Sequence, residues 1–236
     1  MANEIYAGVF RGRKLVQTSG EIGGARSVFV KVKGIKNELV YPTFGGKIMN
    51  PPKGNGFKFY AGDLFEFRTN DEGVNPELYL LKTYLVESVN GTIVNIVNDG
   101  YKHKPFVGDV VGVAPSAIGG TITEATITKV ESAKVGDVAV WACTLSAALS
   151  SAKKGDILVE GDGKGKMLVK AINAVADSDG AMLEASNVGD EFEAARYYYT
   201  PALGGIMYTK KMSPMPACVL AENESKINGW FQIKSI

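Results

Sequence analysis

Residues 82–98 read KTYLVESVNGTIVNIVN and carry the clearest fold signal in the chain. Two runs rich in β-branched and aromatic residues flank Asn90-Gly91, the pair that a type I′ hairpin turn prefers. The first run, TYLVESV, alternates in a way that leaves apolar side chains on both faces. The stretch therefore predicts a β-hairpin whose strands are partly covered on each side.

A Gly-Asp dipeptide recurs before apolar or alternating runs. Glycine adopts positive φ at little cost, and the aspartate that follows can bond nearby main-chain groups before a strand begins. The chain contains 28 glycines and 9 prolines, a composition that also suits many tight turns. The pattern predicts strand starts at five aspartates: Asp63, Asp109, Asp137, Asp156 and Asp190.

The rest of the chain repeats this punctuation. Further strand pairs are predicted at 28–32 with 38–41, 121–130 with 138–143, and 167–175 with 181–185, with a last strand at 230–236. Helical signals are confined to two short segments, 75–77 and 144–153. We therefore expect a mainly β fold, an antiparallel multi-hairpin sandwich or barrel with few short helices.

The length of 236 residues allows one large β domain or two smaller ones. All but one of the arginines precede residue 105, and the alanine-rich segments follow it, which predicts β domains at 27–105 and 106–236. Residues 1–26 have little periodicity, so they form either an extended N-terminal arm or an ordinary first strand at 5–10. The candidate arm contacts are Ile5, Tyr6, Phe10, Arg11 and Arg13.

Charge and hydropathy exclude several partners. Lys plus Arg number 26 and Asp plus Glu 25, so the net charge of +1 gives no general attraction to nucleic acid or anionic membranes. No stretch approaches the roughly 18 consecutive apolar residues of a membrane-spanning helix. The N-terminus lacks the basic start and apolar run of a secretory signal, so we expect synthesis in the cytoplasm. Cys143 and Cys218 lie far apart in apolar runs, which predicts free buried thiols.

The sequence offers little for catalysis or metal binding. The single histidine, His103, stands between Lys102 and Lys104, which opposes an imidazolium and predicts an exposed connector. One histidine and two isolated cysteines cannot assemble a usual zinc site. We therefore expect no catalytic residues, no metal and no cofactor. Four scattered carboxylates keep a glycosidase pair open without identifying one: Glu66, Glu87, Glu191 and Glu193.

Two Gly/Asp-rich runs resemble ligand loops but are better explained as turns. Residues 177–180, DSDG, lack the third acidic position and the spacing of a calcium loop. Residues 161–166, GDGKGK, lack the Gly-Lys-Ser/Thr ending of a phosphate loop and precede a strand pattern instead of a helix. Both are predicted to be hairpin turns.

Aromatic side chains are the main candidates for a binding surface. Three consecutive tyrosines, Tyr197, Tyr198 and Tyr199, would alternate between the faces of a strand, so at least one ring should lie away from the core. Such rings, with Trp141 and Trp230, could stack on a sugar or anchor a protein interface. The alternative is that the tyrosines simply cover both faces of their strand.

The second half of the chain resembles a known class of proteins. Residues 150–160, SSAKKGDILVE, are followed by a Gly-rich tip and MLVK, and residues 106–120 read FVGDVVGVAPSAIGG. This succession of small residues, Gly-Asp turn, strand and Gly-rich tip is similar to that of tailed-bacteriophage capsid-associated proteins of the head-decoration and head-fibre type, including those of crAss-like phages. The resemblance implies β-rich modules that bind the outer face of a capsid lattice, often as oligomers, without catalysis or cofactor.

The resemblance leads to two expectations about function. The first is a virion structural protein at the capsid surface, an auxiliary or decoration protein that stabilises the shell by binding the major capsid protein and copies of itself. The alternative is a receptor- or glycan-binding module of a fibre or tail, in which the aromatic side chains stack on sugars.

Overall fold

The protein is mainly β, as the sequence predicts. The computed structural model describes residues 17–18, 46–50, 58–60, 62–68, 76–98, 103–176, 180–181, 198–199, 205–208, 213–220 and 231–234. Within these ranges the helical structure is one turn at residues 217–220. The helical expectations are wrong: Glu77–Leu80 form strand β5, and after Leu145 the chain makes a turn in which Ala152 N–H donates to the Leu149 carbonyl.

The chain divides into two compact units that interleave in the sequence. The first comprises residues 1–80, 173–212 and 228–236, and the second comprises residues 81–172 and 213–227. The predicted domains 27–105 and 106–236 are consecutive in sequence. The structure instead joins strands from before and after residue 105 in one barrel, because the strands of residues 83–97 pair with strands that follow it.

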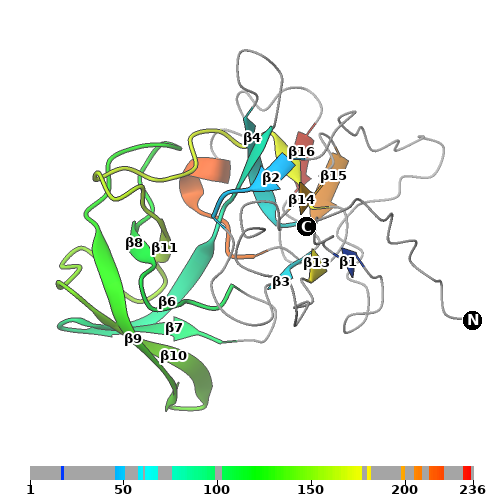
Figure 1. The fold of residues 1–236 in the computed structure, drawn as a ribbon. Coiled ribbons are helices and arrows are strands. Elements are labelled where there is room, and N and C mark those ends of the chain that lie inside the picture. Colours follow the sequence, from blue (N-terminus) through cyan, green and yellow to red (C-terminus); the bar gives the residue numbers. More distant parts are fainter. Residues whose placement is uncertain are drawn as a thin grey trace, which may run out of the picture. The chain divides into compact units, whose positions relative to one another are not determined.

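The second unit contains a closed antiparallel barrel with the strand order β10-β7-β6-β11-β8-β9 (Figure 1). Its strands are β6 (Thr83–Asn90), β7 (Ile93–Val97), β8 (Val110–Val113), β9 (Ala125–Val135), β10 (Val138–Leu145) and β11 (Ile157–Glu160). Strand β11 lies between β6 and β8 and closes the barrel.

The hairpin predicted at residues 82–98 is confirmed as β6–β7, with its turn one residue later than expected. Asn90 pairs with Ile93, so the loop residues are Gly91 and Thr92 instead of Asn90-Gly91. Gly91 has a φ of 59° and occupies the first of the two loop positions, where the turn needs a positive φ. The predicted β9–β10 hairpin is also confirmed.

The barrel core follows from alternation along its strands. On β6, Tyr84 and Val86 are buried while Leu85 and Glu87 are half-buried. The buried cluster consists of Tyr84, Val86, Val94, Ile96, Val111, Ala125, Ile127, Cys143, Leu145, Leu149 and Leu158.

The first unit is built on a five-stranded sheet with the order β12-β4-β5-β2-β14. Its strands are β2 (Gly46–Ile48), β4 (Leu64–Arg68), β5 (Glu77–Leu80), β12 (Ala174–Val175) and β14 (Tyr198–Tyr199). Neighbours are antiparallel except β2 and β5. Its buried cluster includes Phe59 and Phe65, whose rings meet edge to face at 5.7 Å.

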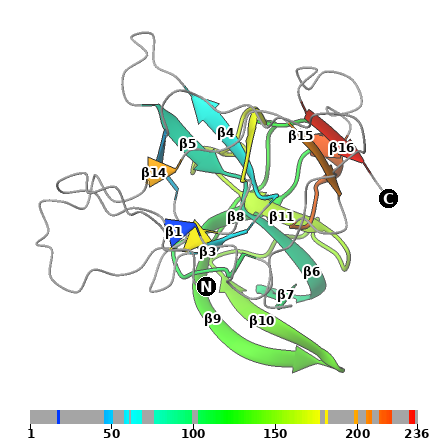
Figure 2. The same ribbon diagram turned by 90° about the vertical axis from the view of Figure 1, so that its right-hand side faces the viewer.

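Two small sheets complete the described strands of this unit (Figure 2). One joins β1 (Gln17–Thr18), β13 (Gly180–Ala181) and β3 (Lys58–Phe59), and the other joins β15 (Gly205–Tyr208) to β16 (Phe231–Lys234) in parallel. The predicted last strand is confirmed by β16. The predicted pairing of 167–175 with 181–185 is wrong, because β12 pairs with β4 while β13 pairs with β1 and β3. The predicted pair 28–32 and 38–41 lies outside the described residues.

Candidate functional site

Three Gly-Asp turns share one geometry. Gly62, Gly108 and Gly155 have φ of 90°, 90° and 89°. In each turn the aspartate N–H donates to the carbonyl three residues earlier, and its Oδ2 accepts the N–H of that same residue. The carboxylate bonds are Tyr60 N to Asp63 (2.7 Å), Phe106 N to Asp109 (2.9 Å) and Lys153 N to Asp156 (2.9 Å).

Each of these aspartates directly precedes a strand, respectively β4, β8 and β11, so the predicted strand starts are confirmed. A fourth, Asp137, lies in the β9–β10 hairpin turn and directly precedes β10. Asp190 lies outside the described residues. The carboxylates of Asp63, Asp109 and Asp156 serve the turns, because they accept main-chain N–H groups at the points where strands begin.

Asp109 also takes part in a buried charged cluster with Lys82 and Glu160. The ammonium of Lys82 lies 2.9 Å from Glu160 Oε1 and 4.0 Å from Asp109 Oδ1. The side chains of Lys82 and Asp109 are only 2% and 1% exposed, and that of Glu160 is 15% exposed. Charged side chains are rarely buried so completely unless they are paired.

The fold brings these three residues to one end of the barrel. Lys82 directly precedes β6, Asp109 directly precedes β8, and Glu160 is the last residue of β11. Because β11 runs antiparallel to both neighbours, its end lies beside their starts. The Gly-Asp turn before β8 therefore places a carboxylate inside the barrel end.

The two oxygens of Asp109 have different surroundings. Oδ2 accepts the Phe106 N–H and, at 3.3 Å, the Tyr84 hydroxyl. Oδ1 is buried and has no hydrogen-bond partner in the described part of the chain. Burial, and then the charges of Asp109 and Glu160, raise the pKa of the Tyr84 phenol well above its ordinary value, so this hydroxyl remains a donor.

His103 is buried next to this cluster, so the expectation of an exposed connector is wrong. The residue is 3% exposed. Its Nδ1 accepts the N–H of Thr83, the first residue of β6, at 3.1 Å. The neighbouring lysine does not determine the exposure of His103, because the Lys104 side chain lies over aromatic rings. Its ammonium lies 4.8 Å from the centre of the Trp141 ring and 5.3 Å from that of Phe106.

The aromatic candidates are only partly described. Trp141 is half-buried on β10, with the Lys104 ammonium over its ring. Tyr198 and Tyr199 form β14 opposite Lys47 and Gly46, and their side chains lie outside the description. Tyr197, Trp230 and the arm residues Ile5, Tyr6, Phe10, Arg11 and Arg13 also lie outside the described residues, so their roles stay predictions.

The candidate glycosidase carboxylates in the described ranges are engaged in ion pairs. Glu66 receives two hydrogen bonds from the Arg68 guanidinium, each 2.7 Å long, and Glu87 pairs with Lys154. Glu66 belongs to the first unit and Glu87 to the second. Glu191 and Glu193 lie outside the described residues, as does the 177–179 run.

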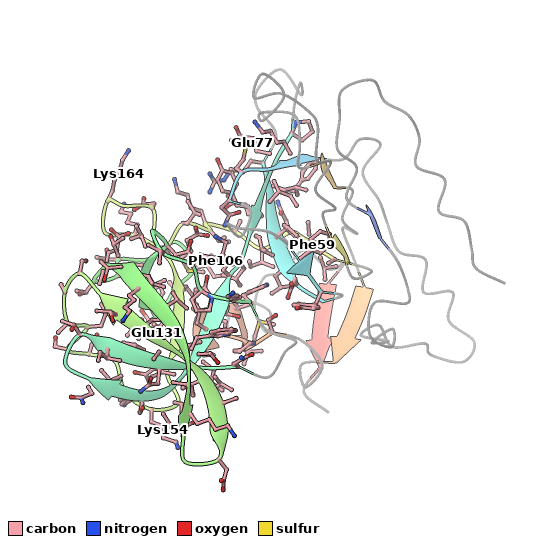
Figure 3. The ribbon with its side chains drawn as sticks, turned by 60° about the horizontal axis from the view of Figure 1, so that its bottom comes forward. Phe59, Glu77, Phe106, Glu131, Lys154 and Lys164 are labelled. Atoms are coloured by element: carbon pink, nitrogen blue, oxygen red, sulfur yellow. The ribbon has the colours of Figure 1, made fainter. Side chains whose placement is uncertain are left out.

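The Gly-rich loop at 161–166 is a hairpin tip, as predicted. Gly161 pairs with Met167, and the amides within the loop point at carboxylates of the protein itself. Glu124 accepts the N–H groups of Gly163 and Gly165 at 3.1 and 3.0 Å. Asp162 Oδ1 accepts those of Lys164 and Lys166 at 2.8 and 3.1 Å. The loop amides are therefore occupied, while Figure 3 shows the Lys164 side chain extending outward from the tip.

Cys143 and Cys218 are both buried and form no disulfide, as predicted. Burial, and next the charge of Asp109, raise the pKa of the Cys143 thiol to about 12. Among the residues that the structure describes, no group of three or more His, Cys, Asp and Glu side chains could hold a metal ion. Within the same ranges, no helix is long and apolar enough to cross a bilayer.

Strand β9 presents an open edge that no motif in the sequence indicates. Strand β8 pairs with β9 only at Ala125 and Thr126, and Ile127 then bonds the main chain of residues 108–109. From residue 128 onward, no described strand lies on that side of β9. Figure 2 shows β9 and β10 together as a long curved ribbon. The open edge is defined here as residues 128–135 of β9.

The pairing register shows which main-chain groups this open edge offers. Val135 pairs with Val138 across a two-residue turn, so alternate β9 residues, starting at Val135, bond to β10. Consequently the N–H and carbonyl groups of Val130, Ser132 and Lys134 point away from β10. Side chains along the edge are exposed or half-buried and include the surface ion pair of Lys129 and Glu131, 2.9 Å apart. Figure 3 shows the position of Glu131.

Comparisons of this chain with protein-family models, with curated proteins and with solved structures found no match.

Proposed function

We propose that this chain is a virion structural protein that binds the outer capsid surface as an auxiliary or decoration protein and stabilises the shell. The observation that carries a binding role is the open edge of β9. A strand with unpaired main-chain groups can accept an extended segment of another chain, with main-chain hydrogen bonds supplying affinity and alternate side chains supplying register. The capsid as partner rests on the sequence resemblance of about the last 130 residues.

The open edge has features that suit specific pairing. Unprotected edge strands promote aggregation, and proteins usually limit this with charged side chains. Lys129, Glu131 and Lys134 provide charges of both signs along this edge. An added strand with complementary charges would be favoured over a merely apolar one, which restricts the partners.

A non-catalytic role agrees with the state of the candidate catalytic groups in the described ranges. The Glu66 and Glu87 carboxylates are ion-paired, and His103 already accepts a main-chain N–H at Nδ1. The proposed partners are the major capsid protein and copies of this chain, after synthesis in the host cytoplasm. The predicted N-terminal arm would add a second contact to the capsid.

Co-sedimentation with capsids that lack this protein tests the proposal. The purified chain is expected to pellet with such particles in a saturable manner and to raise the temperature at which they break open. Absence of binding to these particles at micromolar concentrations would overturn the proposed function.

A receptor- or glycan-binding module is the second candidate, and the half-buried ring of Trp141 favours it. Trp141, or one of Tyr197, Tyr198, Tyr199 and Trp230, would supply a stacking face for a sugar. A glycan array separates the candidates, because a decoration protein should bind capsids and no glycan. Selective glycan binding that is lost in Trp141→Ala would support the second candidate.

A further inference from the structure

We propose that Lys82 and Asp109 become joined by an intramolecular isopeptide bond, with Glu160 transferring the protons. The bond would link Lys82 Nζ to Asp109 Cγ and release one water molecule. It would be a covalent modification inside the barrel, independent of the capsid-binding role.

The reacting groups already lie together. Lys82 Nζ is 4.0 Å from Asp109 Oδ1, the oxygen that would leave, and 2.9 Å from Glu160 Oε1. Oδ1 is buried and has no hydrogen-bond partner in the described structure, which is unusual for a buried carboxylate oxygen. Reacting atoms that are held close together in a packed site gain a large effective concentration.

Conversion to an amide would remove buried charge from this cluster. The nucleophile must be a neutral amine and the electrophile a neutral carboxylic acid, forms that proton transfer from Lys82 through Glu160 to Asp109 would supply. The cluster contains two carboxylates for one ammonium, with Lys82 and Asp109 almost completely buried. A buried ion pair contributes little net stability, so its conversion to a neutral amide removes charges that are expensive to bury.

The surroundings of Asp109 supply the electrophilic activation. Oδ2 receives hydrogen bonds from the Phe106 N–H at 2.9 Å and the Tyr84 hydroxyl at 3.3 Å. Negative charge would develop on this oxygen when the amine attacks Cγ. Two fixed donors at that position act as an oxyanion hole.

The atoms balance without any co-reactant. Glu160 takes a proton from the Lys82 ammonium and passes it to Oδ1 of the Asp109 carboxylate, which leaves a neutral amine, a neutral carboxylic acid and a Glu160 carboxylate that can accept another proton. The Nζ lone pair then forms the bond to Cγ while the C=O π electrons move to Oδ2. The intermediate transfers a second proton from Nζ to Glu160, which protonates the departing Oδ1, so that water leaves and the C=O re-forms. The net change converts one ammonium and one carboxylate into an amide and water.

The link would fasten the start of β6 to the start of β8. A cross-link between residues 82 and 109 closes a loop that contains β6 and β7, which restricts the unfolded chain as a disulfide does. Unlike a disulfide, it requires no oxidant, and neither cysteine of the protein forms a disulfide.

Mass spectrometry of the purified full-length protein under denaturing conditions tests the proposal. The wild-type chain is expected to be lighter than its sequence mass by one water molecule. Glu160→Gln should retain the full mass apart from the substitution, whereas the control Glu131→Gln, at an exposed carboxylate, should lose water like the wild type. A wild-type chain at its unmodified mass would overturn the proposal.

Tryptic mapping of the wild-type chain locates the change. The isopeptide bond would block cleavage after Lys82 and would keep fragment 69–102 joined to fragment 103–129 after cleavage at Lys102. Succinimide formation at an Asp-Gly bond also releases water, but it leaves fragments 69–82, 83–102 and 103–129 separate. Separate fragments would therefore overturn the proposal, and neither wild-type measurement depends on whether Glu160→Gln folds.

Discussion

Asp63 Oδ2 accepts the main-chain N–H of Tyr60 at 2.7 Å, and the Asp63 N–H donates to the Tyr60 carbonyl at 2.9 Å. This reciprocal pair closes the Gly-Asp turn directly before β4. The carboxylate is almost completely buried, so its loss would leave the Tyr60 N–H without this acceptor. The turn should therefore contribute to stability through one identifiable side chain.

Asp63→Ala is expected to lower the free energy of unfolding by about 1–3 kcal/mol, the usual cost of an unsatisfied polar group. Urea denaturation measures the change. Asp137→Ala is the matched control, because this exposed aspartate also follows a turn glycine, and it should shift stability by no more than about 0.5 kcal/mol. Equal effects of the two substitutions would contradict the assigned role of the Asp63 carboxylate.

Gly155→Ala should destabilise the second unit through backbone strain alone. Gly155 has a φ of 89°, and a Cβ added there meets nothing within 4 Å. The expected cost in unfolding free energy is about 1–2 kcal/mol. Gly155→Asn should cost less, because asparagine tolerates positive φ better than alanine does. Thermal denaturation checks the order, and an alanine variant as stable as the wild type would refute this explanation.

Glu124→Gln should loosen the Gly-rich loop at 161–166. Each Glu124 oxygen accepts one glycine N–H, at Gly163 and Gly165, and an amide side chain can replace only one of these acceptors. Hydrogen exchange is expected to become faster at one or both glycines. Glu131→Gln serves as the control with unchanged exchange at these positions. Unchanged exchange in Glu124→Gln would show that the carboxylate does not order the loop.

Asp162 should make the same loop sensitive to acid. The Lys164 N–H, followed by the Lys166 N–H, lowers the pKa of Asp162 below its ordinary value. A lowered pKa in the folded state means that the contribution to stability is present above the unfolded pKa and is lost as pH falls through the folded one. The amide shifts of Lys164 and Lys166 should therefore titrate below about pH 4. Asp162→Asn should abolish that titration, and its persistence would contradict the assignment.

Both thiols should resist alkylation in the folded protein. Burial is the main cause that raises the pKa of Cys143 to about 12, and Cys218 is buried as well. Thiolate is the reactive form, so iodoacetamide at pH 8 should modify neither cysteine until denaturant is added. Because the thiol pKa is raised on folding, its contribution to stability is present below the unfolded pKa and declines between about pH 9 and pH 12. Rapid labelling of Cys143 under native conditions would contradict its burial.

Local turn chemistry made much of the fold predictable from sequence. The positive φ values of Gly62, Gly108 and Gly155 and the hairpins β6–β7 and β9–β10 follow from short-range preferences. Pairings between distant segments did not follow, since β12 pairs with β4 and β11 closes the barrel. Alternation identifies which face of a strand is apolar, but it does not name the neighbouring strand.

The candidate site was less predictable for the same reason. Lys82, Asp109 and Glu160 are separated in sequence, and each also fits an ordinary solvent-exposed position. Only the barrel topology brings them together. His103 was wrongly expected to be exposed because its sequence neighbours are lysines, whereas its Nδ1 is bonded to the N–H of Thr83. The open edge of β9 likewise depends on where β8 ends, which no local motif encodes.

The most direct test of capsid binding through β9 compares two substitutions at one position. Ser132→Ala and Ser132→Pro both remove the hydroxyl, but only proline removes the N–H that points away from β10. Co-sedimentation with capsids lacking this protein measures their affinities. Ser132→Ala is expected to bind like the wild type and Ser132→Pro at least about tenfold more weakly, since 1.4 kcal/mol of lost binding energy is a factor of ten. Equal binding of the two variants, with both folded, would contradict the claim that the open edge of β9 is the binding surface.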